Sequence, residues 1–407
     1  MPSFYLLSTM TVAYLLYLSG MIRYIPAPPA LHVLILTTIC CSLFSTLFFS
    51  PVFSREINSR EPLRFIHAAY ARSIPYRLFF WSLLLLGMAG IFKYTLDYSR
   101  YLGGKGFFFI LFFENSGEIR SLAENVTSIG TQLSYLTWIA AFLLAIDIGT
   151  GARKKRWIWL IGFIILINLV YVDRTRPVSI IFTAVLCYFA VAFPGISRRK
   201  ISRAIIGLGI AALTLFVLIG LWLGKVSSQE YTRAGLPPAL QPVVLYTTSA
   251  FAYLGKEIEM DKPKDYKPVR ITYPLQKILA GTGLVNEPPS QILEFYYVPV
   301  PTNVGTFLEP FYADGGIPYC ILAILLHTFL FDILALFFLK NATRFTIMAL
   351  ATLCFTDFIA FFAVKITVLF TWIILASAFL SLLGKALGQK ASGTGTGNPV
   401  KQDTGIS

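Results

Sequence analysis

Long apolar runs alternate with short polar connections along most of the chain. A run of about 20 apolar residues is long enough to cross a bilayer as a helix. The pattern therefore predicts an all-α polytopic membrane protein with about ten transmembrane helices. The expected spans are residues 3–22, 31–50, 77–96, 127–149, 157–173, 177–194, 204–224, 317–340, 345–364 and 366–385.

The composition agrees with a membrane protein, because 56% of the residues are hydrophobic and only 13% are charged. A soluble domain carries about 25% charged residues. All five cysteines lie in or beside apolar runs, so we expect no disulfide framework, no metal site and no cofactor. The absence of a Gly-x4-Gly-Lys-Ser/Thr motif argues against direct use of ATP.

The basic residues indicate orientation rather than nucleic-acid binding. Although the net charge is +14, the Lys and Arg residues gather in three short connections, at 51–76, 150–156 and 195–203. Short basic loops stay in the cytoplasm. Both termini are therefore expected on the cytoplasmic side of the membrane.

Two connections are then expected on the periplasmic side. The run 106–113 in the smaller one is too short to span and should lie at the interface or re-enter. The predicted organisation is residues 1–224 with spans one to seven and a small periplasmic loop at 97–126, residues 225–316 as one large periplasmic loop between spans seven and eight, residues 317–388 with spans eight to ten, and a disordered tail at 389–407.

The large loop is the best place to look for function, because loops longer than about 15 residues are usually functional. Its end, residues 301–319, reads PTNVGTFLEPFYADGGIPY. Glu309 and Asp314 offer carboxylates that suit a general base. Asp314 has a second interpretation as a cap of the eighth span, where the helix dipole favours negative charge. Asn303 and Thr306 offer hydrogen bonds, and the ring of Tyr312 suits a sugar face or the membrane interface.

Arginines supply a second signal, because the planar guanidinium binds phosphate oxygens in pairs. Arg174 and Arg176 lie in the short outer hairpin between spans five and six. Arg233 and Arg270 lie in the large loop, and Arg120 lies in the smaller one. The alternative for the hairpin is snorkelling to the headgroups, with Asp173 neutralising Arg174.

Residues 302–316 resemble the Asn-Val-x-Thr…Pro-x-Tyr-x-Asp-Phe-Gly segment of Wzy-type O-antigen polymerases, the oligosaccharide repeat-unit polymerases of the bacterial inner membrane. Residues 175–181 are similar to the family's Ser-Arg-x-x-Leu stretch, and residues 245–252 to its Tyr-x-Ser/Gly segment. The chain departs from the family pattern at Gly315, where the family has Phe, and at Tyr319, where it usually has Gly.

The resemblance implies a glycosyltransferase that polymerises undecaprenyl-diphosphate-linked oligosaccharides on the periplasmic side. These lipids would be donor and acceptor, with a chain-length regulator and a flippase as further partners and no nucleic acid. The expected site residues are Asp314 and Glu309 for catalysis, Arg176, Arg174, Arg120, Arg233 and Arg270 for the diphosphate, and Asn303, Thr306, Tyr312 and Tyr246 for the glycan.

Two rival functions stay open. An O-antigen ligase has a similar architecture but is expected to carry a catalytic histidine in its large loop, and residues 225–316 contain none. A flippase or transporter without chemistry should carry charge within the membrane. Charged residues in or near the expected spans are Lys93, Asp147, Asp332, Asp357 and Lys365.

Overall fold

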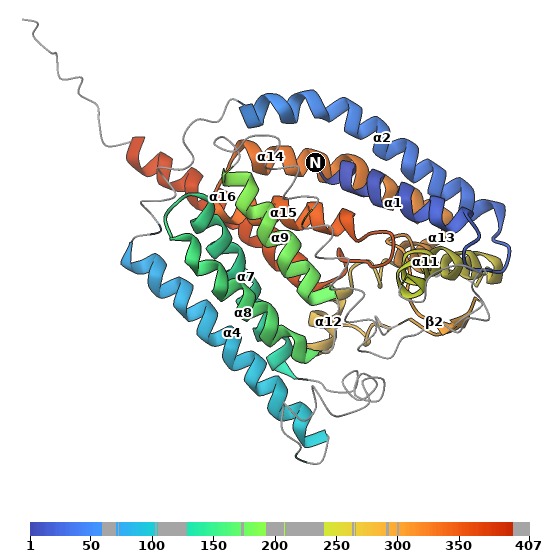
Figure 1. The fold of residues 1–407 in the computed structure, drawn as a ribbon, viewed down its shortest axis with the longest axis horizontal. Coiled ribbons are helices and arrows are strands. Elements are labelled where there is room, and N and C mark those ends of the chain that lie inside the picture. Colours follow the sequence, from blue (N-terminus) through green and yellow to red (C-terminus); the bar gives the residue numbers. More distant parts are fainter. Residues whose placement is uncertain are drawn as a thin grey trace, which may run out of the picture.

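The computed structural model of the chain is helical throughout most of the part that it describes (Figure 1). The described residues are 1–58, 71, 73–101, 104, 128–171, 175–192, 207, 240–262, 264, 266–289, 293–298 and 301–393. Six helices in this part are long and apolar enough to cross a membrane. The chain is therefore a multi-pass helical membrane protein.

The elements follow one another in this order: α1 (Pro2–Leu18), α2 (Pro29–Asn58), α4 (Ile74–Tyr101), α7 (Ile129–Gly149), the 3₁₀ turn η1 (Lys155–Trp157), α8 (Ile158–Asn168), the 3₁₀ turn η2 (Leu169–Tyr171), α9 (Thr175–Ala192), α11 (Gln241–Met260), α12 (Tyr273–Gly281), β1 (Tyr296–Tyr297), β2 (Pro301–Thr302), α13 (Glu309–Leu325), the π-helical turn η5 (Leu326–Leu330), α14 (Phe331–Lys340), α15 (Arg344–Phe358) and α16 (Leu369–Gly393). The six apolar helices are α2, α4, α7, α9, the continuous α13–η5–α14 segment and α16.

Helices α4, α7, α8 and α9 form one side of the molecule, and α4 packs along α7 through small residues (Figure 1). A Cβ atom added to Gly90 would lie 2.5 Å from the Cβ of Leu133, and one added to Gly130 would lie 2.4 Å from the Gly90 carbonyl oxygen. Glycines allow such close approach, which is how helices associate in a bilayer where lipid is as apolar as the side chains.

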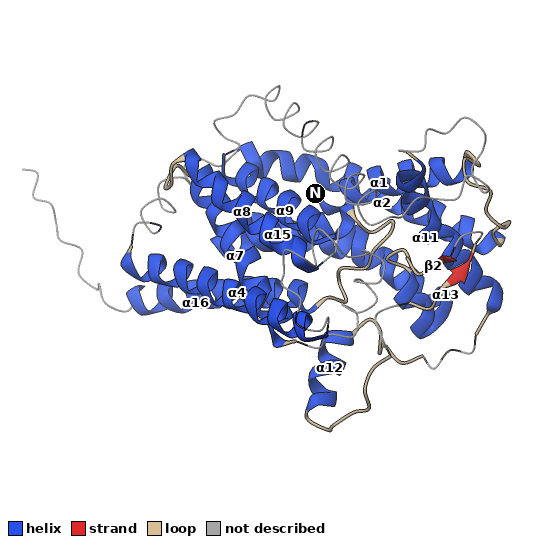
Figure 2. Cartoon of the chain, turned by 60° about the horizontal axis from the view of Figure 1, so that its bottom comes forward, coloured by secondary structure: helices blue, strands red, loops and turns tan. Residues whose placement is uncertain are grey.

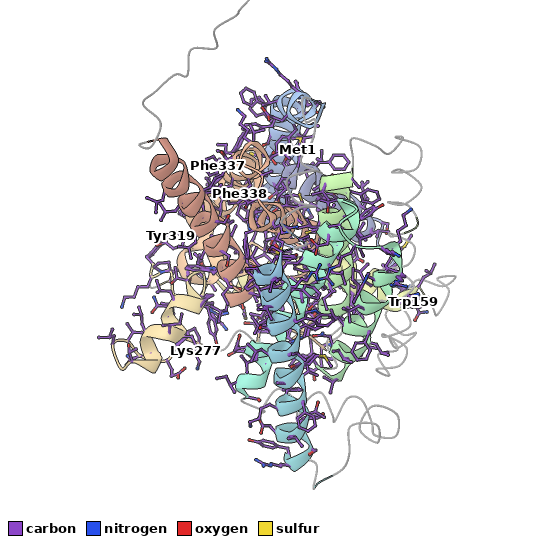
Figure 3. All side chains as sticks on the ribbon, turned by 90° about the vertical axis from the view of Figure 1, so that its left-hand side faces the viewer. Met1, Trp159, Lys277, Tyr319, Phe337 and Phe338 are labelled. Atoms are coloured by element: carbon purple, nitrogen blue, oxygen red, sulfur yellow. The ribbon has the colours of Figure 1, made fainter. Side chains whose placement is uncertain are left out.

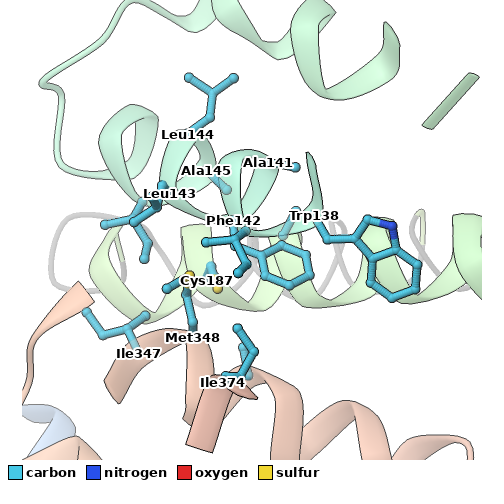
Figure 4. Close-up of a cluster of buried hydrophobic side chains, with 14 of the residues drawn as sticks. Trp138, Ala141, Phe142, Leu143, Leu144, Ala145, Cys187, Ile347, Met348 and Ile374 are labelled. Carbon is cyan, nitrogen blue, oxygen red and sulfur yellow. The ribbon is translucent and has the colours of Figure 1, made fainter. Parts of the chain in front are cut away.

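The larger hydrophobic core joins these helices to α15 and α16. Phe142 of α7, Cys187 of α9, Met348 of α15 and Ile374 of α16 meet in it, and all are fully or almost fully buried (Figure 4). A second core joins α1 and α2 to α11 and α13. The first helices of the chain thus contribute to the second core, whereas its last helices, α15 and α16, contribute to the larger one.

The segment 225–316 is more ordered than expected. It contains α11, a helix of 20 residues that packs against α1 and α2. The prediction of a loop with little structure is wrong for this stretch, because Val244, Phe251 and Leu254 repeat at helical spacing and are all buried. In contrast, α12 and the loop after it extend away from the other helices (Figure 2). Lys277 of α12 lies at the edge of the molecule (Figure 3).

Three predicted boundaries differ from the structure. The eighth span begins earlier than expected, because α13 starts at Glu309 and only breaks at Gly315–Gly316. The ninth is shorter, because residues 359–368 after α15 are not helical. The last helix runs to Gly393, so the start of the expected disordered tail is helical. Residues 394–407, most of the expected span 204–224 and the run 106–113 lie outside the described residues.

Candidate functional site

The end of the long segment enters the protein interior instead of lying on its surface. Thr306, Phe307 and Leu308 have no exposed area. The backbone N–H of Phe307 donates to the carbonyl oxygen of Ala360 at 2.8 Å, and the Phe307 ring lies 4.6 Å from the imidazole of His327, centroid to centroid. These contacts fix the backbone immediately before α13, which begins with Glu309.

Asp314 connects the break in α13 to the loop that precedes α12. Its carboxylate accepts the backbone N–H of Arg270 at 2.9 and 3.1 Å and that of Ile271 at 3.0 Å. The break follows at once, since Gly316 has φ 64° and ψ −151°, a conformation that is essentially restricted to glycine. Asp314 therefore caps backbone groups, as one sequence interpretation held, but those of another segment rather than of its own helix.

Glu309 is a buried carboxylate with a partly exposed cation beside it. Only 5% of the residue is exposed, and Oε1 accepts from Nη1 of Arg270 at 3.0 Å, while one third of the Arg270 side chain reaches the surface. Glu309 is also the first residue of α13, where the helix dipole favours a negative charge. A Cβ at Gly305 would lie 2.7 Å from the Cβ of Glu309, so the chain needs glycine there.

Helix α11 supplies a second carboxylate to the same region. Tyr296 donates to Glu257 at 2.6 Å and accepts from Nζ of Lys262 at 2.9 Å. This second hydrogen bond raises the pKa of the Lys262 ammonium, which favours its charged form. The Tyr296 ring stacks on Tyr253 with centroids 4.8 Å apart. We call Glu257, Arg270, Tyr296, Glu309 and Asp314 the Glu309 cluster.

Arg176 lies in the first turn of α9, inside a cage of aromatic rings. Its guanidinium carbon is 3.7 Å from the ring centroid of Tyr171, 5.2 Å from that of Tyr135 and 5.8 Å from that of Trp138. Nη1 donates to Oγ of Ser134 at 3.1 Å, and the residue is 8% exposed. Stacking of this kind orients the planar group and strengthens its charge interactions by removing water.

The non-helical residues 359–368, which we call the bridge segment, connect the Glu309 side of the site to the Arg176 side. Ala360 accepts the hydrogen bond of Phe307 described above, next to the start of α13. Nζ of Lys365 donates to Oγ1 of Thr175 at 3.2 Å, next to Arg176 at the start of α9. The bridge segment thus contacts residues next to Glu309 and next to Arg176, and it adds a further cation, Lys365.

The predicted site residues divide into those that the structure brings together and those that it separates. Arg270, Glu309 and Asp314 form one cluster, whereas Arg176 lies apart from it in the aromatic cage. Asn303 and Tyr246 are half-buried. Arg120, Arg174 and Arg233 lie outside the described residues.

Two predicted glycan contacts are not available at the surface. Thr306 has no exposed area, and its Oγ1 accepts the N–H of Leu308 at 3.3 Å. Tyr312 is 4% exposed, and Nζ of Lys264 lies 4.1 Å from its ring centroid. The sequence predicts an exposed loop around both residues, whereas the fold buries this segment against the bridge segment.

Sequence reasoning missed three of the polar groups in this region. Lys264 and Glu257 are not among the residues that the sequence predicts for the site, and Lys365 is predicted only as a charge in or near a span. Glu257 follows Tyr253 and Leu254 on the amphipathic pattern of α11, so that pattern was the available signal. Nothing in the sequence places Lys365 beside Thr175, because the contact joins residues that are far apart in the chain.

Several charges within the helices are held by neighbouring helices. Asp147 accepts from Nη2 of Arg344 at 3.0 Å and from the hydroxyl of Tyr76 at 3.0 Å. Asp357 pairs with Nδ1 of His327 at 2.6 Å, and both side chains are buried. Pairing of this kind offsets part of the cost of removing a charge from water. No group of three or more metal-ligating side chains occurs in the described residues.

No protein-family model matches this sequence, and no curated protein or solved structure matches it significantly. The function is therefore inferred from the residues and their geometry.

Proposed function

We propose that the chain is a lipid-diphosphate-dependent glycosyltransferase that polymerises oligosaccharide repeat units at the periplasmic face of a bacterial inner membrane. The ion pair between the buried Glu309 and the partly exposed Arg270 is the observation that carries the proposal. Glu309 lies within the stretch that resembles the polymerase motif. In this arrangement the protein has about ten spans, both termini are cytoplasmic, and the segment 225–316 lies outside.

In the proposed reaction, two cations bind the diphosphate leaving group. Arg176 and Lys365 lie at the start of α9, and a guanidinium with a fixed orientation suits the oxygens of a diphosphate. Fixed cations stabilise the negative charge that develops on the departing diphosphate, and they need no reorganisation when the bond breaks. The bond between the donor sugar's anomeric carbon and the diphosphate oxygen is the one that breaks.

Glu309 is the group that we assign as the base. The acceptor's hydroxyl oxygen forms the new glycosidic bond, its proton passes to Glu309, and the polyprenyl diphosphate leaves. Arg270 holds Oε1 of this carboxylate and reaches the surface, so it can also contact an incoming anionic group. Asp314 is less suited to the role, because its two oxygens are already occupied by backbone N–H groups.

One observation favours the transporter as a second candidate. Nε2 of His327 and Oδ2 of Asp357 are buried and have no hydrogen-bond partner among the residues that the structure describes. Unsatisfied ionisable groups within a helical bundle are uncommon and occur in proton pathways. The two functions differ in their product. A transporter moves lipid-linked sugar across the membrane, whereas a polymerase also forms a new glycosidic bond.

The proposal is tested by elongation with the purified full-length protein in detergent and undecaprenyl-diphosphate-linked oligosaccharide as the only substrate. Wild-type protein should produce a ladder of longer glycans on a gel, and Glu309→Gln should produce none. Glu287→Gln is the matched control, because Glu287 is exposed and pairs with the exposed Lys277. A wild-type protein that folds but forms no ladder, or a Glu309→Gln variant with full activity, would refute the assignment.

A further inference from the structure

A cavity of about 570 Å³ lies between the end of α1 and the start of α2, apart from the Glu309 cluster. Its lining includes Tyr17, Arg23, Tyr24, Ile25 and His32. The size is suited to a polar headgroup, since small-molecule sites are typically about 300–1,000 Å³. Neither the sequence interpretation nor the proposed reaction uses these residues.

The polar groups of the cavity favour an anion. Arg23 is exposed and makes no ion pair or hydrogen bond with the residues that the structure describes. Nδ1 of His32 is engaged by the hydroxyl of Tyr14 at 2.7 Å, which leaves Nε2 as the ring nitrogen available to a ligand. No carboxylate is among the described residues that line the cavity. The first turn of α2, which has no acidic residue, adds the positive end of a long helix dipole.

The aromatic walls of the cavity are held in place by neighbouring helices. The rings of Tyr17 and Tyr24 stack with centroids 5.4 Å apart, and the hydroxyl of Tyr24 contacts Oγ1 of Thr248 on α11 at 2.7 Å. Gly255 of α11 approaches the same turn, because a Cβ there would lie 3.4 Å from the Cβ of Ala27. These contacts with α11 hold the aromatic walls of the cavity in fixed positions.

The rim of the cavity is apolar and faces outward. Leu18 and Ile25 line it and are 54% and 46% exposed. Along α2, a candidate membrane span, Val33 and Leu36 continue the exposed apolar surface. A ligand with a charged head and a hydrocarbon tail fits such an arrangement, with its head at Arg23 and its tail along α2.

We propose that this cavity binds the phosphate group of a membrane lipid, either a phospholipid monophosphate or a polyprenyl diphosphate, through Arg23 and His32. Two-point contact by a guanidinium and an imidazole suits a phosphate oxygen pair. The positive end of the α2 dipole adds to the attraction for the phosphate, and the tail lies against the exposed side chains of α1 and α2.

Native mass spectrometry of the full-length protein in detergent tests the proposal by direct counting of bound lipid. Phosphatidylglycerol and undecaprenyl diphosphate are titrated separately, with inorganic diphosphate as a third probe. Wild-type protein should bind one lipid phosphate with saturation, and Arg23→Gln should weaken that binding at least about tenfold, the effect of losing a charge-assisted hydrogen bond. The lipid that binds more tightly to wild type identifies the source of the phosphate.

Arg55→Gln is the matched control, because Arg55 is an exposed arginine in the last turn of the same helix, at the opposite end. It should bind lipid as the wild type does. His32→Gln gives a second measurement at the site, and its folding is checked by thermal unfolding. Unchanged binding by Arg23→Gln, equal weakening by Arg55→Gln, or inorganic diphosphate binding as tightly as either lipid would overturn the proposal. The measurement is of binding alone, so it stands or fails independently of glycan elongation.

Discussion

Glu309 and Asp314 lie in the same short helical stretch and are both buried, yet their partners give them different roles. Asp314 holds backbone N–H groups with both oxygens, so its charge stabilises the approach of the loop before α12 to the break in α13. In the part of the chain that the structure describes, Glu309 has a single side-chain partner, Arg270, which it contacts through one oxygen. A carboxylate with an uncommitted oxygen is better placed to accept a proton from a substrate.

Asp314→Asn should therefore lower the free energy of unfolding while it leaves the elongation rate of the folded protein almost unchanged. The amide still accepts N–H groups through one oxygen but has no charge, and the cost is about 1–3 kcal/mol. Thermal unfolding in detergent measures this loss, and elongation per folded molecule should stay close to that of the wild type. Asp261→Asn is the control, because Asp261 is exposed. An Asp314→Asn variant with wild-type unfolding but no elongation would instead make Asp314 the base.

Arg176→Lys should fail nearly as badly as Arg176→Ala in the elongation assay. A lysine ammonium cannot stack as a plane on Tyr171 or present two donors to a diphosphate. We expect at least about a tenfold loss of rate, because a desolvated cation–π contact is worth about 2 kcal/mol. Arg153→Lys is the matched control, since Arg153 also lies over an aromatic ring, 4.1 Å from that of Phe80, but at the expected cytoplasmic end.

Full activity of Arg176→Lys would show that position 176 needs only a positive charge and not a planar group with two donors. Equal loss in the Arg153→Lys control would show that any caged arginine is needed for folding, so thermal unfolding of all three variants accompanies the assay.

At the scale of the element, the apolar pattern predicts those helices whose boundaries are set locally. The span expected at 127–149 is observed as Ile129–Gly149, because Ser128 caps its start by accepting the N–H of Gly130. The end of α15 at Phe358 was not predictable in the same way. Residues 359–368 are apolar enough to continue the helix, but their backbone is hydrogen-bonded to the segment that carries Phe307, which no local pattern indicates.

The break in α13 depends on Gly316, and Gly316→Ala should destabilise the protein. Its backbone has φ 64° and ψ −151°, where a Cβ is strained by about 1–3 kcal/mol. Thermal unfolding should show the loss, and elongation should fall because the break positions Asp314 and Glu309. Gly384→Ala in α16 is the control, because a Cβ at Gly384 meets nothing within 4 Å and should stabilise the helix by up to about 1 kcal/mol. If the two variants unfold at the same temperature, the proposed backbone strain of alanine at position 316 is contradicted.

For the molecule as a whole, the sequence indicated a helical membrane protein but not how its distant parts meet. Composition and periodicity are properties of single segments, so they predicted the helices and two groups of candidate residues. The contact of Lys365 with Thr175 and that of Phe307 with Ala360 join residues distant in the chain. Such contacts depend on the packing of many helices, and they are what relates the Arg176 cage to the Glu309 cluster.

The orientation of the whole molecule is the assumption on which the proposed reaction depends, and two cysteine probes test it. In a background whose five cysteines are replaced by alanine, Thr282→Cys should react with a membrane-impermeant thiol reagent added to intact cells. Ser54→Cys, beside the basic residue Arg55, should react only after permeabilisation, because short basic loops stay in the cytoplasm. Both positions are exposed in the structure, so access to the reagent depends on the membrane rather than on burial. Elongation by the cysteine-free protein confirms its fold.

Labelling of Ser54→Cys from outside would reverse the orientation of the protein. The Glu309 cluster would then lie away from the lipid-linked glycans of the outer leaflet, and the polymerase assignment would fail.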